Sequence, residues 1–281
     1  MKINLEEVDV EDLQGQEFEK FSGKPHRLKG RQTVTQLVSR KVSYTDPFAK
    51  FEHPDLNDLC RMGYLDELLS GIKTGKEASV FLGLNSNGYV AVKVYTDLRV
   101  RSFKRDETYR EGRFVGDARL QKAIDHGSQK GLEAHQALWV QEEFRQMRHL
   151  QQCGVKVPRA IAVNGIALIM EFIGDQNGSP APRLSDLHLD QDQAREAFRQ
   201  AVNNLKLIVS AGRVHGDYST FNILWQNGQA VVIDFPQVME FDHNPQARTF
   251  LERDVRSLCK SFLKLGVQAD ETKILREVRS H

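Results

Sequence analysis

Two short motifs in the last third of the chain constrain its fold most strongly. The first is VHGDYSTFNILW at 214–225, and the second is VVIDFPQ at 231–237. Each joins a loop acid to a short apolar run that is typical of a strand, so adjacent strands are predicted to present both loops. A carboxylate at the end of an apolar strand, such as that of Asp234, is costly to bury unless another group compensates it. The two motifs together therefore indicate a functional site rather than two capping turns.

The polar residues of these motifs suit the transfer of a phosphoryl group. That reaction needs little covalent chemistry from a protein, but it needs a carboxylate at the attacking oxygen and oxygen ligands for Mg²⁺. We predict that Asp217 acts as the base or orients the attacking group, and that Asn222 and Asp234 hold the metal. Asp217 and Asp234 are thus candidate catalytic residues, together with the lysine described next.

Lys93 lies in the apolar segment Ala91-Val92-Lys93, which the alternation predicts to be the second strand of a hairpin. A lysine there would project from a sheet and contact nucleotide phosphates. Glu143 supplies a partner, because the helical spacing places it on the same face as Trp139 and Met147, where a carboxylate is tolerable only when it is paired. Glu142 is the competing choice. We therefore expect Lys93 and Glu143 to form an ion pair at the nucleotide.

A short turn before this hairpin is a candidate phosphate loop, whose backbone N–H groups would surround the phosphates. It has one glycine, unlike a GxGxxGxV loop, and it lacks the GxxxxGK[ST] pattern of P-loop proteins. Its position ahead of the strand that carries Lys93 favours the interpretation as a phosphate loop. The candidate phosphate-binding residues are Thr74, Gly75, Lys76, Glu77, Ala78, Ser79 and Val80.

The composition fits a globular protein. The 281 residues, 40% of them apolar, are enough for one large domain or two lobes with a buried core. With 39 basic and 38 acidic side chains the formal net charge is +1, so no field of the whole molecule argues for a nucleic-acid partner. The three cysteines form no CxxC pair, and no apolar run approaches the roughly 20 residues that cross a bilayer. We expect a cytoplasmic protein without a membrane partner.

Hydrophobic periodicity gives a coarse order of elements along the chain. A polar, mobile extension is expected at 1–50 and a long flexible insertion at 99–131. A Gly- and Pro-rich stretch at 174–184 is typical of a linker between lobes. The expected helices and strands are a helix that starts at Pro54 and Asp55 and follows the spacing to Leu68, a hairpin of 79–83 and 89–95, a helix over 133–152, a strand over 166–173, and helices over 190–211 and 248–265.

In their order, these motifs resemble the RIO family of atypical protein kinases over roughly residues 50–270. KTGKEASVF is similar to the family's STGKEA phosphate loop, except that Lys73 replaces the usual serine. WVQEEFRQMRHL resembles the family's helix with the glutamate that pairs with lysine, carried onto Glu143. LIMEFIG resembles its hinge. The tail from Val238 resembles the first RIO subfamily and IDFPQ the second, so the subfamily stays open.

The resemblance implies an α+β, bilobal protein-kinase-like fold with ATP and Mg²⁺ between the lobes, and Mn²⁺ as a substitute. The implied N-lobe spans 51–172 and the reduced C-lobe spans 173–281. The hinge implies adenine contacts from the backbone of Glu171 and Ile173, with Met170 guarding the pocket. The resemblance further implies phosphoryl transfer to serine or threonine of proteins, including the chain itself, or ATP hydrolysis. In the family, the counterpart of Asp234 is also a proposed site of transient phosphorylation.

Two other functions stay open from the sequence. An aminoglycoside-kinase-like phosphotransferase also uses an HGD…N loop, but only 47 of the 281 residues follow Asp234, too few for the large substrate pocket expected there. A nucleotide-dependent switch that acts in ribosome assembly is the second. A ribosomal or RNA-associated partner would bind the basic segments 20–50 and 99–113. Ser102, ahead of Thr108, is the candidate site of autophosphorylation.

Overall fold

The described residues of the computed structural model are 38–39, 49–75, 78–95, 126, 128–242 and 244–280. All of them belong to one compact unit, residues 32–281. The predicted extension at 1–50 and the predicted insertion at 99–131 therefore lie largely outside the described residues.

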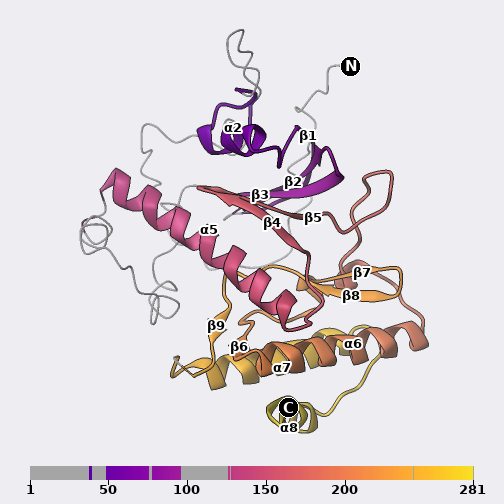
Figure 1. Cartoon of the computed structure of the whole chain (residues 1–281). Helices are drawn as coiled ribbons and strands as arrows, with labels where there is room; N and C mark the ends of the chain where they lie inside the picture. The colour runs from indigo at the N-terminus through magenta and orange to yellow at the C-terminus, as the bar shows by residue number, and fades with distance from the viewer. Residues whose placement is uncertain are drawn as a thin grey trace, which may run out of the picture. The chain divides into compact units, whose positions relative to one another are not determined.

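The first part of this unit is a five-stranded antiparallel sheet in the order β1-β2-β3-β5-β4 (Figure 1). The expected hairpin is present, with its turn at Asn85 to Gly88, where Gly88 has a φ of 113°. Its first strand is longer than predicted, because pairing continues from Ala78 to Asn85. The strands are β1 (Glu67–Thr74), β2 (Ala78–Asn85), β3 (Gly88–Tyr95), β4 (Ala160–Asn164) and β5 (Ala167–Glu171).

The helix before the sheet is shorter than its hydrophobic spacing predicted. Helix α2 (Pro54–Arg61) begins where the His53 side chain accepts a hydrogen bond from the Asp55 amide. It ends before Gly63, whose φ of 74° is a left-handed conformation that stops the helical ladder. Leu68, expected in this helix, lies in strand β1, which the sequence did not predict.

The two faces of the sheet pack against different partners. Val90, Val92 and Val94 of β3 face a small core that α2 covers. Lys93 and Tyr95 alternate to the opposite face, and Tyr95 belongs to the larger core shared with α5 and the C-terminal helices. Strand β3 thus carries its lysine on the face directed at the rest of the chain.

Helix α5 (Gln129–Gln152) crosses beside the sheet and contacts β4 and β5 (Figure 1). The sequence placed its start at 133 and the end of the insertion at 131. The helix begins earlier because the Ser128 hydroxyl caps it by accepting a hydrogen bond from the Gly131 amide at 3.1 Å.

The described C-terminal part contains one short hairpin, a second two-stranded sheet that joins strands distant in the sequence, and three α-helices. Helices α6 and α7 contact each other through the rings of Phe198 and Phe262, whose centroids are 5.1 Å apart. Helix α8 packs against both and was not predicted. The elements are η3 (Leu184–Asp186), α6 (Gln191–Ser210), β6 (Arg213–Val214), η4 (Thr220–Asn222), β7 (Ile223–Gln226), β8 (Gln229–Val232), β9 (Met239–Glu240), α7 (Ala247–Leu263) and α8 (Glu271–Arg279).

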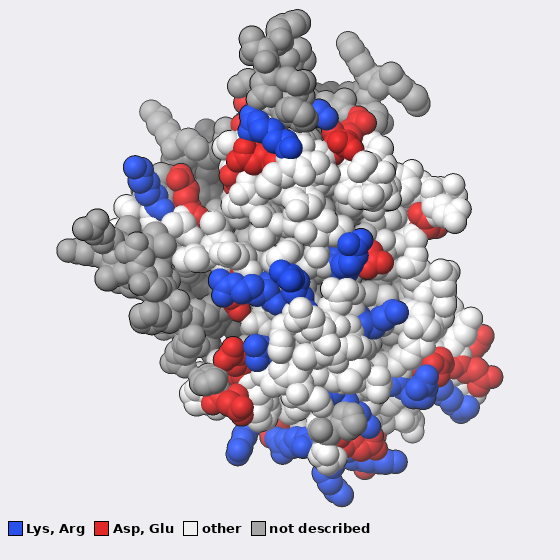
Figure 2. Space-filling view, viewed as in Figure 1, with Lys and Arg blue, Asp and Glu red and all other residues white. Residues whose placement is uncertain are grey.

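Charges of both signs are mixed on the surface. Figure 2 shows basic and acidic side chains on one face of the molecule, with several basic groups near its centre and both signs mixed toward its upper and lower ends. This distribution agrees with the formal net charge of +1. Among the helices that the structure describes, none combines the length and apolar character of a membrane-spanning segment.

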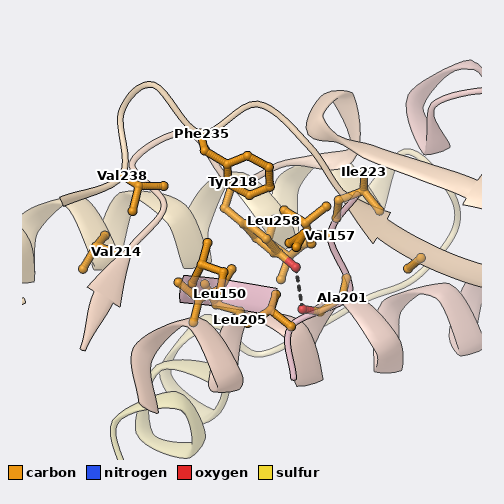
Figure 3. Packing of buried hydrophobic residues seen from close by; sticks show 14 of the residues in the cluster. Leu150, Val157, Ala201, Leu205, Val214, Tyr218, Ile223, Phe235, Val238 and Leu258 are labelled. Carbon is orange, nitrogen blue, oxygen red and sulfur yellow. Dashed lines mark hydrogen bonds between the residues drawn. The ribbon is translucent and has the colours of Figure 1, made fainter. Parts of the chain in front are cut away.

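The larger core fixes the loop that carries the HGD motif. Tyr218 is fully buried, and Figure 3 shows its ring among apolar side chains with its hydroxyl directed at the Ala201 carbonyl. That hydrogen bond is 2.8 Å long and joins the loop to α6. Phe235, which follows Asp234, lies in the same core (Figure 3). Each acidic loop is therefore anchored by a buried aromatic side chain directly after its aspartate.

Candidate active site

The ammonium group of Lys93 joins the two halves of the unit. Its Nζ lies 2.7 Å from Glu143 Oε1 on α5 and 2.8 Å from Asp234 Oδ1 in the loop after β8. Glu142, the competing choice, instead bonds Gln146 and Arg145. The structure thus brings together three residues that span 141 positions of the sequence, and it pairs Lys93 with the glutamate that the helical spacing favoured.

Burial and charge act against each other in this cluster. Burial alone would lower the pKa of Lys93, but the carboxylates of Asp234 and Glu143 raise it well above its ordinary value. Burial raises the pKa of Glu143, only partly opposed by Lys93. Burial also opposes ionisation of Asp234, yet the charge and hydrogen bond of Lys93 hold the pKa of that carboxyl below its usual range. A cation at position 93 and an anion at position 234 are therefore the stable states.

Asp217 and Asn222 form one unit in the HGD loop. Asn222 Nδ2 donates to the backbone carbonyl of Asp217 at 2.9 Å and to Asp217 Oδ2 at 3.0 Å. Asn222 is 6% exposed, whereas Asp217 is exposed. The amide thus orients a carboxylate that stays accessible, while the asparagine's own oxygen is left for another contact.

The backbone of this loop requires glycine at 216. Its φ is 82°, and a Cβ there would lie 2.8 Å from the Gln237 carbonyl oxygen. His215, which precedes it, is fully buried and packs edge-on against Tyr218 and Phe235. Its Nδ1 accepts a hydrogen bond from the Asp217 amide at 3.3 Å. His215 therefore packs against the core and orients the loop.

Asp254 on α7 is a structural partner of the site that the sequence analysis missed. Its carboxylate is completely buried and accepts hydrogen bonds from the amides of Gly216 at 2.8 Å and Tyr218 at 3.0 Å. The neighbouring Arg253 donates to the Gly216 carbonyl. Burial raises the pKa of Asp254, although His215 and the two amides oppose that effect. Helix α7 thus holds the amides on both sides of Asp217.

Asp234 adopts a backbone conformation that is unusual for a residue with a side chain. Its φ is 71°, and such left-handed residues cost about 1–3 kcal/mol unless their surroundings hold them. The ion pair with Lys93 and the buried ring of Phe235 hold it here. In this conformation the carboxylate contacts Lys93 of the sheet, with 42% of the Asp234 side chain still exposed.

The candidate phosphate loop lies at the turn between β1 and β2. The Gly75 amide donates to the Ala78 carbonyl at 3.0 Å, and a Cβ on Gly75 would lie 2.9 Å from that oxygen. Thr74 ends β1, and Ala78, Ser79 and Val80 begin β2, whereas Lys76 and Glu77 fall outside the described residues. Ser79 pairs with Val94 and so faces away from Lys93, which leaves its backbone as the group available to a phosphate.

The predicted hinge begins in the last residues of β5 and continues beyond its end. Met170 pairs with Ala91 on the Lys93 face of the sheet. The Glu171 amide donates to the Arg159 carbonyl at 2.8 Å, and the Ile173 carbonyl accepts from the Ala181 amide at 2.9 Å. Met170, Glu171 and Ile173 are thus contiguous with the Lys93 strand, at the start of the segment that leads to the C-terminal part.

The oxygen donors of the site fit a magnesium ion to which the protein supplies only some of the ligands. Among the residues that the structure describes, no three His, Cys, Asp or Glu side chains gather to form a metal site. The candidate ligands are one carboxylate and one amide, Asp234 and Asn222. Mg²⁺ is commonly bound by one or two protein groups, with water and substrate phosphates completing its shell. The donor set therefore suits a magnesium that arrives with a nucleotide.

Comparison with known proteins decides the family. A family model of the RIO domain matches residues 79–274, which include the Lys93 strand and the loops of Asp217 and Asp234. The chain belongs to the RIO domain family. It is 36% identical over 275 residues to "RIO-type serine/threonine-protein kinase Rio1" of Haloferax volcanii, a match that covers 94% of this chain and 86% of that protein.

Other relatives are longer than this RIO domain protein. "Serine/threonine-protein kinase RIO1" of Homo sapiens is 31% identical over 277 residues, and the match covers 95% of this chain but 45% of the human protein. The Caenorhabditis elegans protein of the same name is 32% identical, with 78% of this chain and 42% of the relative covered. The chain thus spans less than half the length of these two relatives.

Solved structures confirm the predicted fold. The Rio2 kinase from Chaetomium thermophilum, solved as an ADP/Mg²⁺-phosphoaspartate complex, matches with a TM-score of 0.59 at 18% identity, over 86% of this chain and 72% of that one. A second Rio2 structure from the same organism matches with a TM-score of 0.57 at 21% identity, over 79% of this chain and 66% of that one. The α+β, bilobal kinase-like fold that the family resemblance implied is therefore correct for this RIO domain.

Proposed function

We propose that this RIO domain transfers the γ-phosphate of ATP to serine or threonine side chains of proteins, including its own, and also releases phosphate to water. The observation that carries the proposal is the bridge from Lys93 to Glu143 and Asp234, with the exposed carboxylate of Asp217 on the neighbouring loop. The names of the relatives, which are serine/threonine-protein kinases, support the same activity.

The chain's own residues divide the work as follows. Lys93, held by Glu143, binds phosphate oxygens and neutralises charge as the terminal phosphate is transferred. Asp217 accepts a hydrogen bond from the attacking hydroxyl, orients it and takes its proton as the new bond forms. Asp254 and His215 keep that loop in place through its backbone.

The nucleotide is proposed to lie against the Lys93 face of the sheet. At the hinge, we propose that the Glu171 carbonyl contacts adenine, because the Glu171 amide already donates to the Arg159 carbonyl. The Ile173 amide is the second proposed adenine contact, because the Ile173 carbonyl already accepts a hydrogen bond from the Ala181 amide. Met170 borders the adenine, and the backbone from Thr74 to Val80 surrounds the phosphates.

Asn222 and Asp234 are the proposed ligands of Mg²⁺, with Mn²⁺ as a substitute. When bound, the ion neutralises charge on the phosphates of ATP. The Rio2 complex contains ADP, Mg²⁺ and phosphoaspartate, and Asp234 is the residue of this chain that we propose as the corresponding transient acceptor.

Asp234→Asn is expected to weaken Mg²⁺-dependent ATP binding and turnover together, because an amide lacks the charge that attracts a hard cation. Asparagine tolerates left-handed φ, so the φ of 71° at this position is retained. Asn222→Ala should act in the same direction but more mildly. ATP affinity measured with and without Mg²⁺ checks this. An unchanged dependence on Mg²⁺ in both variants would remove them as metal ligands.

Labelled ATP distinguishes the possible fates of the γ-phosphate. The purified chain is incubated with γ-labelled ATP and Mg²⁺, and protein-bound label and free phosphate are followed together. Acid-stable protein label indicates serine or threonine, and label that hydroxylamine releases indicates an aspartyl phosphate. Free phosphate without protein label would favour an ATP-driven switch, and absence of both would refute phosphoryl transfer.

Autophosphorylation is expected within the insertion that joins the Lys93 strand to α5. Ser102 is the first candidate and Thr108 the second, and both lie outside the described residues. This segment begins shortly after the Lys93 strand and ends in the first turn of α5, and a phosphate in it would pair with nearby arginines. Mass spectrometry after incubation with MgATP tests this. Phosphate found only outside 99–131, or equally on an Asp217→Ala protein, would contradict it.

Partners and location are further proposals. We propose a protein substrate, and a ribosomal or RNA-associated partner at the basic segments 20–50 and 99–113, which lie almost wholly outside the described residues. The three cysteines, Cys60, Cys153 and Cys259, are free thiols, which supports a reducing, cytoplasmic environment. No observation favours a small-molecule acceptor.

A further inference from the structure

A second lysine lies on the face of the sheet that carries Lys93. Lys73 of β1 pairs with Val80 of β2, and Val80 in turn pairs with Lys93 of β3. Residues opposite each other in neighbouring strands share a face, so all three side chains leave the sheet on the same side. With neighbouring strands about 4.8 Å apart, the two lysines are separated by about 10 Å at their backbones.

A β-bulge produces this placement. Gly71 pairs with Phe81 and Lys73 with Val80, so Ile72 is an extra residue without its own partner. In a regular ladder, Ile72 would face Val80, and Lys73 would face Ser79 on the side of α2. Bulges of this kind redirect side chains beside functional sites. Here the bulge moves a cation from the α2 side of the sheet to the Lys93 side.

The charge of Lys73 acts on the acids across from it. Burial and then Lys93 dominate the pKa of Asp234, and Lys73 adds a smaller lowering effect. The pKa of Asp186 in η3 responds in the same way: burial raises it, and Arg183, Ser185 and Lys73 lower it below its usual range. Arg183 already holds the Asp186 carboxylate, with its Nε 2.7 Å from Oδ2. Lys73 is exposed and so can turn toward a ligand between these groups.

We propose that Lys73 is a second phosphate-binding cation, which contacts the terminal phosphates of a nucleoside triphosphate from the β1 side while Lys93 contacts them from β3. This rests on the proposed binding of ATP at the Lys93 face. A triphosphate carries its charge at the end farthest from the base, where a cation beside the Gly75 turn is placed to reach it. Lys73 is thus a residue that distinguishes triphosphates from monophosphates.

The test compares the affinities of ATP, ADP and AMP by calorimetry in the presence of Mg²⁺, without reference to turnover. Lys73→Ala is expected to weaken ATP binding about tenfold, as expected for loss of one charge-assisted contact, with a smaller effect on ADP and none on AMP. Lys73→Arg should retain most of the ATP affinity, and the ATP effect should shrink at high salt. Lys264→Ala, at an exposed lysine of the C-terminal part, is the matched control and should change nothing.

Several outcomes would overturn the assignment. If Lys73→Ala weakens the binding of all three nucleotides equally, Lys73 contacts the protein and not a phosphate. Asp186 is then its partner if Asp186→Asn causes the same loss of affinity and the double variant binds no more weakly than Lys73→Ala. Unchanged affinities for all three would show that Lys73 contacts no phosphate. If the unmodified chain binds none of the nucleotides, the proposed function fails as well, so the two failures are distinguishable.

Discussion

Asp217→Ala is expected to lower the rate of phosphoryl transfer by about 10²–10⁴-fold while ATP still binds, since loss of a catalytic acid or base has effects of that size. The carboxylate is exposed, and Asn222 keeps its second hydrogen bond to the Asp217 carbonyl, so the loop should retain its conformation. Single-turnover kinetics with labelled ATP, together with a separate measurement of ATP affinity, check this result.

Asp192→Ala provides the matched control for Asp217→Ala. Asp192 is 96% exposed in the first turn of α6, and its loss should leave both rate and affinity unchanged. Retention of more than about a tenth of the wild-type rate by Asp217→Ala would contradict the assigned role, because the expected loss is at least a hundredfold. A parallel loss of ATP affinity would indicate that Asp217 holds the nucleotide instead.

Lys93→Met is expected to destabilise the protein by about 3–5 kcal/mol and to abolish turnover, because it leaves Glu143 as a buried charge without its partner. The Glu143 side chain is 2% exposed, and its Oε2 finds no hydrogen-bond partner among the described residues. Denaturant unfolding without nucleotide measures the loss. Adding Glu143→Gln should recover a large part of the stability but none of the activity.

Lys206→Met is the comparison for this ion pair. Lys206 Nζ lies 2.9 Å from Glu277 Oε2, but the two side chains are 24% and 37% exposed. A pair this accessible contributes about 0–1 kcal/mol. A Lys93→Met variant no less stable than Lys206→Met would contradict the view that the buried pair supports the fold. If the variant that combines Lys93→Met with Glu143→Gln is less stable than Lys93→Met alone, the unpaired buried charge is not the cause of the loss.

The sequence predicted local contacts of the candidate site better than the long-range packing that brings its residues together. Lys93 and Glu143 were paired correctly because strand alternation and helical spacing each fix the direction of a side chain. The Asp217–Asn222 contact is similarly local, since it spans five residues. Pairing of Lys93 with Asp234 depends on long-range packing, which no local pattern reports.

Three features escaped prediction for identifiable reasons. Strand β1 lacks clean alternation because it is bulged after Leu68 and again after Gly71, so the spacing of Leu68 with α2 was misleading. Asp254 had a usable signal, because it lies on the apolar face of α7 with Leu251, Val255 and Leu258, as Glu143 does on α5. Helix α8 is short and mostly charged, with only Ile274 and Val278 buried.

The most direct test of the proposed nucleotide site is a crystal structure of the chain with a non-hydrolysable ATP analogue and Mg²⁺. The account predicts phosphate oxygens within hydrogen-bond distance of Lys93, a metal ion on Asn222 and Asp234, and the terminal phosphate facing Asp217. Adenine should lie beside Met170. A nucleotide bound away from the Lys93 face, or a metal ion held without Asp234, would contradict it.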